Sequence, residues 1–229
     1  MPRVTLYFDP VSPWSFFALA VLKRYRQIWG LEVVLKPTFL GGVMAAAKNK
    51  PPLEVINKGK WMNGEDLPLA SQFYRLPYTF PTQFPLSTIH CVRFLRAVEM
   101  KYGQGEKLDK ATDAFFAAIW QSPASLPAIE AIKPAIIPRV AAVVFSPEEV
   151  KELIQLATGD EIKGLLKSES GAVVEEEGAF GFPWMVVERD DGVKRNFFGS
   201  DRFEQMAFWL GKPWHGPVPD EKGVRASKL

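Results

Sequence analysis

The chain of 229 residues contains a single cysteine, Cys91, and only two histidines, His90 and His215. One cysteine cannot form an intramolecular disulfide, a CxxC redox pair or a cysteine zinc site, and two histidines add too few ligands for a His/Cys metal cluster. We therefore expect no bound metal, and any thiol chemistry must use a thiol from another molecule. The lone cysteine also fits a reducing compartment.

The sequence lacks long apolar runs and an excess of charge of either sign. No stretch of about 18 uninterrupted apolar residues occurs, so no membrane span is expected. The 28 basic and 26 acidic side chains leave a net charge of +2, which is too small to predict nucleic-acid binding. The 47% of apolar residues predicts a globular chain with a core of ordinary size.

The beginning of the chain predicts a βαβ unit. Residues 4–8 form a β-branched and aromatic run typical of a buried strand, and apolar residues at helical spacing predict a helix over 13–29 with Gly30 after its end. Residues 31–36 alternate as a second strand, which Pro37 ends. A right-handed crossover would make the two strands parallel.

The middle of the chain predicts helices and no convincing strand. Helical patterns cover 86–102, 109–120 and 160–177, and a capping box with proline at N1 starts another helix at Ser146. The last third returns to strands at 184–188 and 193–198, which flank an Asp-Gly turn typical of a β-hairpin.

A final helix is predicted over 201–210, where Asp201 and Glu204 have the spacing of a capping box. The order β-α-β, helical block, β-β-α predicts an α/β protein with a thioredoxin-like domain that a helical insertion interrupts. We expect residues 1–50 and 178–229 to form the discontinuous thioredoxin-like domain and residues 51–177 to form the insertion domain.

In such a fold the reactive centre lies where the first strand meets the first helix, and Ser12-Pro13-Trp14-Ser15 occupies that place. One interpretation is structural, because serine followed by proline is a common N-cap and N1 pair. The functional interpretation uses the same geometry. A helix N-terminus stabilises a thiolate, and Ser12 would donate its hydroxyl hydrogen to that sulfur.

Two further segments have both a structural and a functional interpretation. Pro183 either belongs to a plain turn or is a cis proline that turns the Phe182 N–H and C=O towards a peptide ligand. Ser200 and Asp201 either cap the last helix or hold the carboxylate and the ammonium of an amino-acid head group. Asn49 and Lys58, in contrast, carry little signal alone, because charged loop residues are usually solvated.

The sequence printed here ends in Ser227-Lys228-Leu229, which has the form of a peroxisomal address read by an import receptor. No secretory signal and no Arg- and Ser-rich transit segment precedes the first strand. We therefore expect a peroxisomal location.

Together, these motifs make the sequence similar, nearly from end to end, to the kappa-class glutathione transferases. They are the Tyr-Phe-Asp…Ser-Pro-Trp-Ser opening, Asn49-Lys50-Pro51-Pro52, Gly178-Ala179-Phe180-Gly181-Phe182-Pro183, Phe198-Gly199-Ser200-Asp201-Arg202 and Gly216-Pro217-Val218-Pro219. The resemblance implies a dimeric thioredoxin-like protein that binds glutathione as a co-substrate, and it adds the mitochondrion as a second possible location.

The resemblance also implies a role for individual residues. Ser12 would be the catalytic residue that hydrogen-bonds the glutathione sulfur, with Pro13 and Trp14 beside it. The remaining implied glutathione contacts are the loop residues Asn49 and Lys58, the main chain of Phe182 before the cis Pro183, and Ser200 and Asp201 at the γ-glutamyl head.

Two positions depart from the family pattern. A smaller aliphatic residue is more usual before the proline, so Phe182 is expected to narrow the space near the sulfur. Around Trp61 to Leu67 the chain carries an extra residue, and an acidic contact that the family takes from a partner subunit could be Glu65 or Asp66.

We therefore expect a glutathione transferase that lowers the pKa of the bound thiol and directs the thiolate at a small hydrophobic electrophile or a hydroperoxide. A glutathione-dependent isomerase of the 2-hydroxychromene-2-carboxylate type and a non-catalytic glutathione-binding protein remain alternatives. A disulfide oxidoreductase is excluded by the cysteine count.

Overall fold

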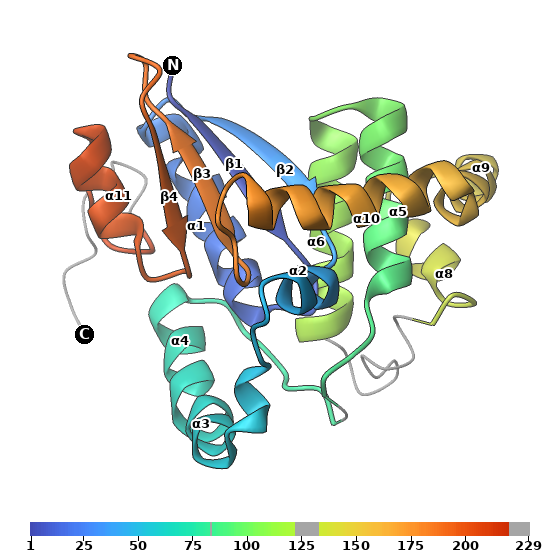
Figure 1. Cartoon of the computed structure of the whole chain (residues 1–229), viewed down its shortest axis with the longest axis horizontal. Helices are drawn as coiled ribbons and strands as arrows, with labels where there is room; N and C mark the ends of the chain where they lie inside the picture. Colours follow the sequence, from blue (N-terminus) through green and yellow to red (C-terminus); the bar gives the residue numbers. More distant parts are fainter. Residues whose placement is uncertain (83, 122–132, 220–229) are drawn as a thin grey trace.

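The centre of the molecule is a four-stranded sheet of order β2-β1-β3-β4 (Figure 1). Strand β1 (Arg3–Phe8) pairs in parallel with β2 (Glu32–Pro37) and antiparallel with β3 (Trp184–Glu188), which forms a hairpin with β4 (Lys194–Phe198). The predicted parallel pair and the predicted β-hairpin are thereby confirmed. Two strands that are about 175 positions apart in the sequence, β1 and β3, lie side by side at its centre.

The computed structural model describes residues 1–82, 84–121 and 133–219. The predicted peroxisomal address Ser227-Lys228-Leu229 lies outside these residues. In the described part of the chain, no helix combines the length and the apolar character needed to cross a membrane.

Helices cover both faces of the sheet, and β1 is buried completely on one face and partly on the other. Its alternate residues Val4, Leu6 and Phe8 are fully buried and belong to the larger hydrophobic core, together with residues of α1 (Pro13–Ile28) and α11 (Phe203–Leu210). The opposite face packs against α2 (Leu40–Ala46) and α10 (Asp160–Glu175) in a smaller cluster. In Figure 1, α10 crosses in front of the strands and α1 lies behind them.

The segment between β2 and β3 is helical throughout its described secondary structure, as predicted. Its elements, besides α2 and α10, are a short 3-10 turn at Pro52–Glu54, α3 (Ile56–Trp61), a π-helical turn (Met62–Asp66), α4 (Leu67–Tyr74), α5 (Ile89–Tyr102), α6 (Glu106–Trp120), α8 (Ile137–Ala141) and α9 (Pro147–Thr158). The predicted helices are confirmed to within a few residues, whereas α2, α3 and α4 were not predicted individually. In Figure 1, α3 and α4 lie beyond one end of the sheet.

One predicted cap is confirmed and one is wrong. The Ser146 hydroxyl accepts from the Glu149 N–H while the Glu149 carboxylate accepts from the Ser146 N–H, so α9 begins with a capping box. Helix α11, in contrast, begins at Phe203 with Arg202 at its N-cap, and no side chain caps it. Asp201 is therefore one residue too early to cap α11.

The larger core runs without a break from the sheet into the helical segment. The ring of Phe116 on α6 lies 5.7 Å from the rings of both Phe8 and Phe16, and the Trp120 indole N–H donates to the Pro10 carbonyl at 2.8 Å. Helix α6 therefore packs directly beneath the loop that leads from β1 into α1. The proposed division into domains at residues 50 and 178 stays a prediction.

This shared core makes a prediction about Phe116. Truncation to alanine should lower the free energy of unfolding by about 3–5 kcal/mol, because the ring is 1% exposed and touches both the sheet and α1. Urea unfolding measures the loss, and Phe208→Ala is the matched control because Phe208 is 89% exposed. Equal effects of the two substitutions would contradict a core that continues from the sheet into α6.

Candidate active site

Ser12 lies at the N-terminus of α1, after the loop that follows β1. Its backbone is extended, and its Oγ accepts a hydrogen bond from the Ser15 N–H at 3.1 Å. Ser12 is therefore the N-cap of α1, as the structural interpretation predicts. The same Oγ donates its hydrogen to the carbonyl oxygen of Phe182 at 3.0 Å. The hydroxyl thus joins the helix N-terminus to the loop before β3.

The peptide bond between Phe182 and Pro183 is cis, as predicted. Asn49 supports this loop from the segment after α2, because its Nδ2 donates to the Phe180 carbonyl at 2.7 Å. On the other side, the Gly199 N–H donates to the Pro183 carbonyl at 3.1 Å. Within the part of the chain that the structure describes, no acceptor is found for the Phe182 N–H, which leaves this donor for a ligand.

The Phe182 side chain is 4% exposed and packs in the smaller hydrophobic cluster with Val43, Val173 and Trp184. Phe182 also lines the same cavity as Ser12, and its effect on the space near the sulfur stays a prediction. A phenylalanine fits before the proline because this cluster has space for it, a signal that local sequence does not contain.

Ser200 is held by a tyrosine that the sequence did not indicate. The Tyr74 hydroxyl at the end of α4 donates to the Ser200 carbonyl at 2.7 Å and lies 3.2 Å from the Ser200 Oγ. Burial raises the pKa of Tyr74 above its ordinary value, so the phenol stays protonated and remains a donor. Its ring stacks on Phe17 of α1 at 4.9 Å, which fixes Tyr74 against the core.

Asp201 and Asp66 form the acidic part of the site. Burial, and then the negative charge of Asp201, raise the pKa of Asp66 above its ordinary value. An ammonium group between these two carboxylates would reduce their mutual repulsion and stabilise the charged form of both. Asp66 ends the π-helical turn between α3 and α4. Such a turn contains one residue more than an α-helical turn, which fits the extra residue expected near Trp61 to Leu67.

A cavity of about 1430 Å³ brings the predicted residues together. Its walls include Ser12, Pro13, Trp14, Asn49, Lys58, Phe182, Ser200 and Asp201, whereas Pro183 is buried behind them. Lys58 is exposed and belongs to helix α3 rather than to a loop. The cavity lies past the end of β1, between the sheet and the α3–α4 pair.

The walls of the cavity are mostly apolar, with charged groups of both signs. The apolar walls include Phe39, Leu40, Met44, Trp61, Met62, Leu69, Phe73, Phe84 and Leu86, and the basic side chains are Lys50, Lys58, Arg75 and Arg202. A second cis peptide bond, Phe84–Pro85, lies in this wall and was not predicted. The cavity can therefore hold a charged ligand and an apolar one at the same time.

Asp9 is a fully buried carboxyl group at the wall of the cavity, and it belongs to the Tyr-Phe-Asp motif, to which the sequence analysis assigned no separate role. Its Oδ1 accepts from the Val11 N–H at 3.0 Å and from the Thr88 hydroxyl at 2.5 Å, and its Oδ2 accepts from the Leu40 N–H at 2.9 Å. Its own carbonyl accepts from the Ser12 N–H at 2.9 Å. Asp9 therefore ties the loop before Ser12 to the start of α2 and the start of α5.

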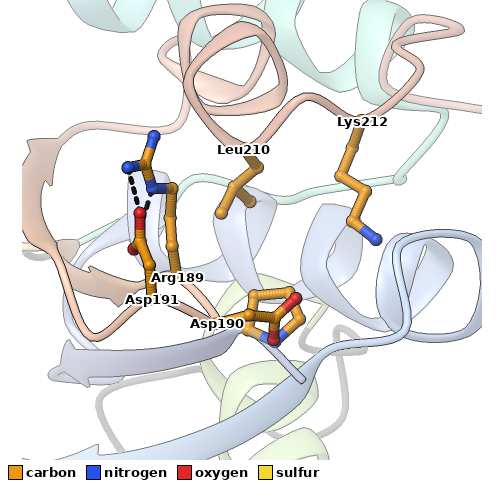
Figure 2. A pocket seen from close by; sticks show the side chains of 6 residues that line it. Arg189, Asp190, Asp191, Leu210 and Lys212 are labelled. Carbon is orange, nitrogen blue, oxygen red and sulfur yellow. Dashed lines mark hydrogen bonds and ion pairs between the residues drawn. The ribbon is translucent and has the colours of Figure 1, made fainter.

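A smaller hollow of about 190 Å³ lies at the other end of β1. Figure 2 shows its walls, which are formed by charged side chains at the tip of the β3–β4 hairpin together with Pro2, Leu210 and Lys212. Arg189 and Asp191 pair with each other there, so their charges are already satisfied. This hollow is separated from Ser12 by the length of β1.

The metal-ligand types and the cysteine lie as follows in the described residues. Within residues 1–82, 84–121 and 133–219, no three His, Cys, Asp or Glu side chains come close enough to hold a metal ion. Cys91 is fully buried in the core, and burial raises the pKa of its thiol. His215 lies at the cavity wall, and its backbone N–H donates to the Tyr25 hydroxyl.

The fold and the site define a thioredoxin-like protein with serine at the N-cap of its first helix. The model of the DsbA-like thioredoxin domain matches residues 3–210. Glutathione S-transferase kappa 1 of Rattus norvegicus is 33% identical over 230 residues, with 98% of each chain covered, and glutathione S-transferase kappa 1 of Homo sapiens is 31% identical, also with 98% of each covered. The solved structure of 2-hydroxychromene-2-carboxylate isomerase superposes with a TM-score of 0.69 at 20% identity, covering 91% of this chain and 94% of the other.

The chain therefore belongs to the DsbA-like thioredoxin family and, within it, to the kappa class of glutathione transferases. The predicted family, fold class and enzyme class are confirmed. The structural likeness to the isomerase confirms the fold.

The buried carboxyl of Asp9 makes a prediction about pH and stability. Burial, opposed by its hydrogen bonds, raises the pKa of Asp9 from 3.8 to about 6. The folded state therefore binds a proton more tightly than the unfolded state, and the stability from this group is present at low pH and lost as the pH rises through 6. Relative to Asp9→Asn, the free energy of unfolding of the wild type should fall by about 2 kcal/mol between pH 4.5 and pH 7.

Urea unfolding at the two pH values measures this difference, and the exposed Glu176→Gln is the control for general charge effects. A difference between wild type and Asp9→Asn that did not depend on pH would contradict the raised pKa of Asp9.

Proposed function

We propose that the cavity binds glutathione with its sulfur at Ser12 and that the enzyme transfers the thiolate to an apolar electrophile. The main support for this proposal is the position of the Ser12 hydroxyl. It lies at the N-terminus of α1, beside the Phe182 carbonyl, on the wall of a mostly apolar cavity. The Ser15 N–H occupies one lone pair of this hydroxyl, so its hydrogen points away from the helix. A bound thiolate would accept that hydrogen in place of the Phe182 carbonyl.

The helix N-terminus and one hydroxyl are sufficient for the required shift in pKa. The ordinary pKa of a cysteine thiol is about 8.5, and lowering this pKa by about two units corresponds to roughly 3 kcal/mol. A charge-assisted hydrogen bond contributes about 1.5–3 kcal/mol, and the positive end of a helix adds about 0.3–1 kcal/mol. Serine itself does not ionise at neutral pH. The group whose pKa the helix N-terminus and the hydroxyl would lower is therefore the thiol of the ligand.

The charges around the cavity fit the charges of glutathione. The γ-glutamyl end carries an ammonium and a carboxylate, for which Asp201 and Asp66 and the uncapped start of α11 beside Ser200 are suited. The glycyl carboxylate fits the basic side of the cavity at Lys58. The free Phe182 N–H would then bond the cysteinyl unit in the manner of an added strand.

The rest of the cavity wall suggests the second substrate. The apolar side chains of α2, α3, α4 and the segment around Phe84 provide no charged partner, so we propose an uncharged, apolar electrophile or hydroperoxide. A homodimer is part of the same proposal. The side chains of Trp61, Leu69 and Phe73 are more than half exposed and would give a second copy an apolar surface on α3 and α4.

The mechanism predicts the effect of removing the hydroxyl. In Ser12→Ala the pKa of bound glutathione should rise by about one to two units, because one charge-assisted hydrogen bond to the thiolate is lost. Glutathione affinity should change little at a pH where the bound thiol is protonated. Thiolate absorbance titrated against pH measures the shift, and Ser15→Ala is the matched control on the same helix turn. An unchanged thiol pKa in Ser12→Ala would refute this role.

The peroxisomal location is a proposal from the sequence alone. A fluorescent protein fused in front of residues 218–229 should enter peroxisomes of a eukaryotic cell, and removal of Leu229 should leave it in the cytosol. Equal distribution of the two fusions would contradict the address. Import into mitochondria in both cases would favour the second location.

A further inference from the structure

Arg24 on α1 is a half-buried cation that binds main-chain carbonyls instead of a carboxylate. Its Nη1 donates to the carbonyl of Tyr74 at 2.8 Å and to the carbonyl of Pro217 at 2.9 Å. Within the described residues it has no acidic side chain at ion-pair distance. Burial, and then the nearby charge of Arg75, lower the pKa of Arg24, so the position costs free energy that the two carbonyl bonds offset.

The two carbonyls belong to two separate parts of the cavity wall. Tyr74 is the last residue of α4, where the unsatisfied carbonyls and the negative end of the helix favour a cation. Pro217 belongs to the segment of residues 213–218 after α11, which we call the strap. The strap and the end of α4 both line the cavity, and Arg24 joins them to the outer side of α1.

Two other side chains, one on α1 and one at its C-cap, also hold the strap, but their hydrogen bonds reach only the strap. The Tyr25 hydroxyl donates to the Gly216 carbonyl at 2.7 Å and accepts from the His215 N–H at 2.9 Å. The Trp29 indole N–H donates to the Pro213 carbonyl at 2.7 Å. Arg24 is therefore the member of this group that also reaches the end of α4.

Tyr74 connects Arg24 to Ser200 in the predicted γ-glutamyl subsite. Its carbonyl is bound by Arg24, its ring stacks on Phe17, and its hydroxyl binds the Ser200 carbonyl at 2.7 Å. A displacement of the Tyr74 backbone would lengthen this last bond and move Ser200. No corresponding connection from Arg24 to Ser12 is found in the described residues.

We propose that Arg24 is a positioning residue for the γ-glutamyl subsite, acting through Tyr74 on Ser200 and through the strap on the wall beside it. The proposal rests on the proposed glutathione site and adds a residue that does not touch the ligand. It requires that Arg24 support recognition of the γ-glutamyl group and not ionisation of the thiol.

The test compares glutathione with cysteinylglycine, which lacks the γ-glutamyl group. In Arg24→Met, the Kd for glutathione should rise about tenfold, corresponding to about 1.4 kcal/mol, whereas the Kd for cysteinylglycine should stay within twofold. Calorimetry measures the Kd of glutathione directly. The Kd of the weaker ligand, cysteinylglycine, is measured by its competition with glutathione. The thiol pKa of bound glutathione should remain that of the wild type, which separates Arg24 from Ser12.

Arg26→Met is the matched control, because Arg26 lies on the same helix but does not line the cavity. Its Nη1 pairs with the Asp109 carboxylate at 3.0 Å. Arg24→Lys keeps one donor group near the two carbonyls and should lose glutathione affinity only a few-fold. If Arg24→Met does not fold, the Arg24→Lys comparison decides the question with the same two ligands.

Three results would overturn the proposal. Equal loss of both ligands would show general damage, and an unchanged glutathione Kd would show that Arg24 does not support the subsite. If the wild type binds neither ligand, the proposed glutathione site is itself wrong and the role of Arg24 falls with it. Wild-type binding with an unchanged ratio of the two Kd values in Arg24→Met refutes the positioning role alone.

Discussion

The site depends on one buried carboxylate, that of Asp9. Its three accepted hydrogen bonds fix the loop before Ser12, the start of α2 and the start of α5, and its carbonyl accepts from the Ser12 N–H. These elements come from separate parts of the chain, and each begins with main-chain or hydroxyl donors that need an acceptor in the interior. A single charged acceptor meets all of these needs. Its cost is the burial of a charge, which appears as the raised pKa of Asp9.

The placement of this carboxylate also bears on the chemistry at Ser12. A negative charge near the sulfur would oppose thiolate formation, whereas the N-terminus of α1 and the Ser12 hydroxyl favour it. The Asp9 oxygens are directed at the Val11 and Leu40 N–H groups and the Thr88 hydroxyl, so part of their charge is balanced by these donors. The hydroxyl of Ser12, in contrast, has one hydrogen that a ligand can take from the Phe182 carbonyl.

The sequence predicts those parts of the fold that depend on local pattern. The strands, α1 with its Ser12 cap and the capping box at Ser146 follow from spacing within a few residues. The same reasoning failed at Asp201, where the spacing to Glu204 fits a cap but the helix starts one residue later than the cap requires. Asp9, Tyr74 and Arg24 could not be found in this way. Their partners are dozens to nearly two hundred residues away, and a single sequence contains no period that links them.

Serine in place of a redox cysteine changes what the fold must recognise. A protein whose reactive sulfur is its own needs no subsite to position that sulfur, because the peptide chain does so. In the proposed mechanism the sulfur arrives with glutathione, so binding energy from the rest of the ligand has to place it within reach of Ser12. The distant contacts of the cavity then become part of the chemistry, since a misplaced γ-glutamyl group would move the thiol from the helix N-terminus. The hydrogen bonds from α1 to the strap and to the end of α4 fit this need, because they tie the far wall of the cavity to the helix that begins at Ser12.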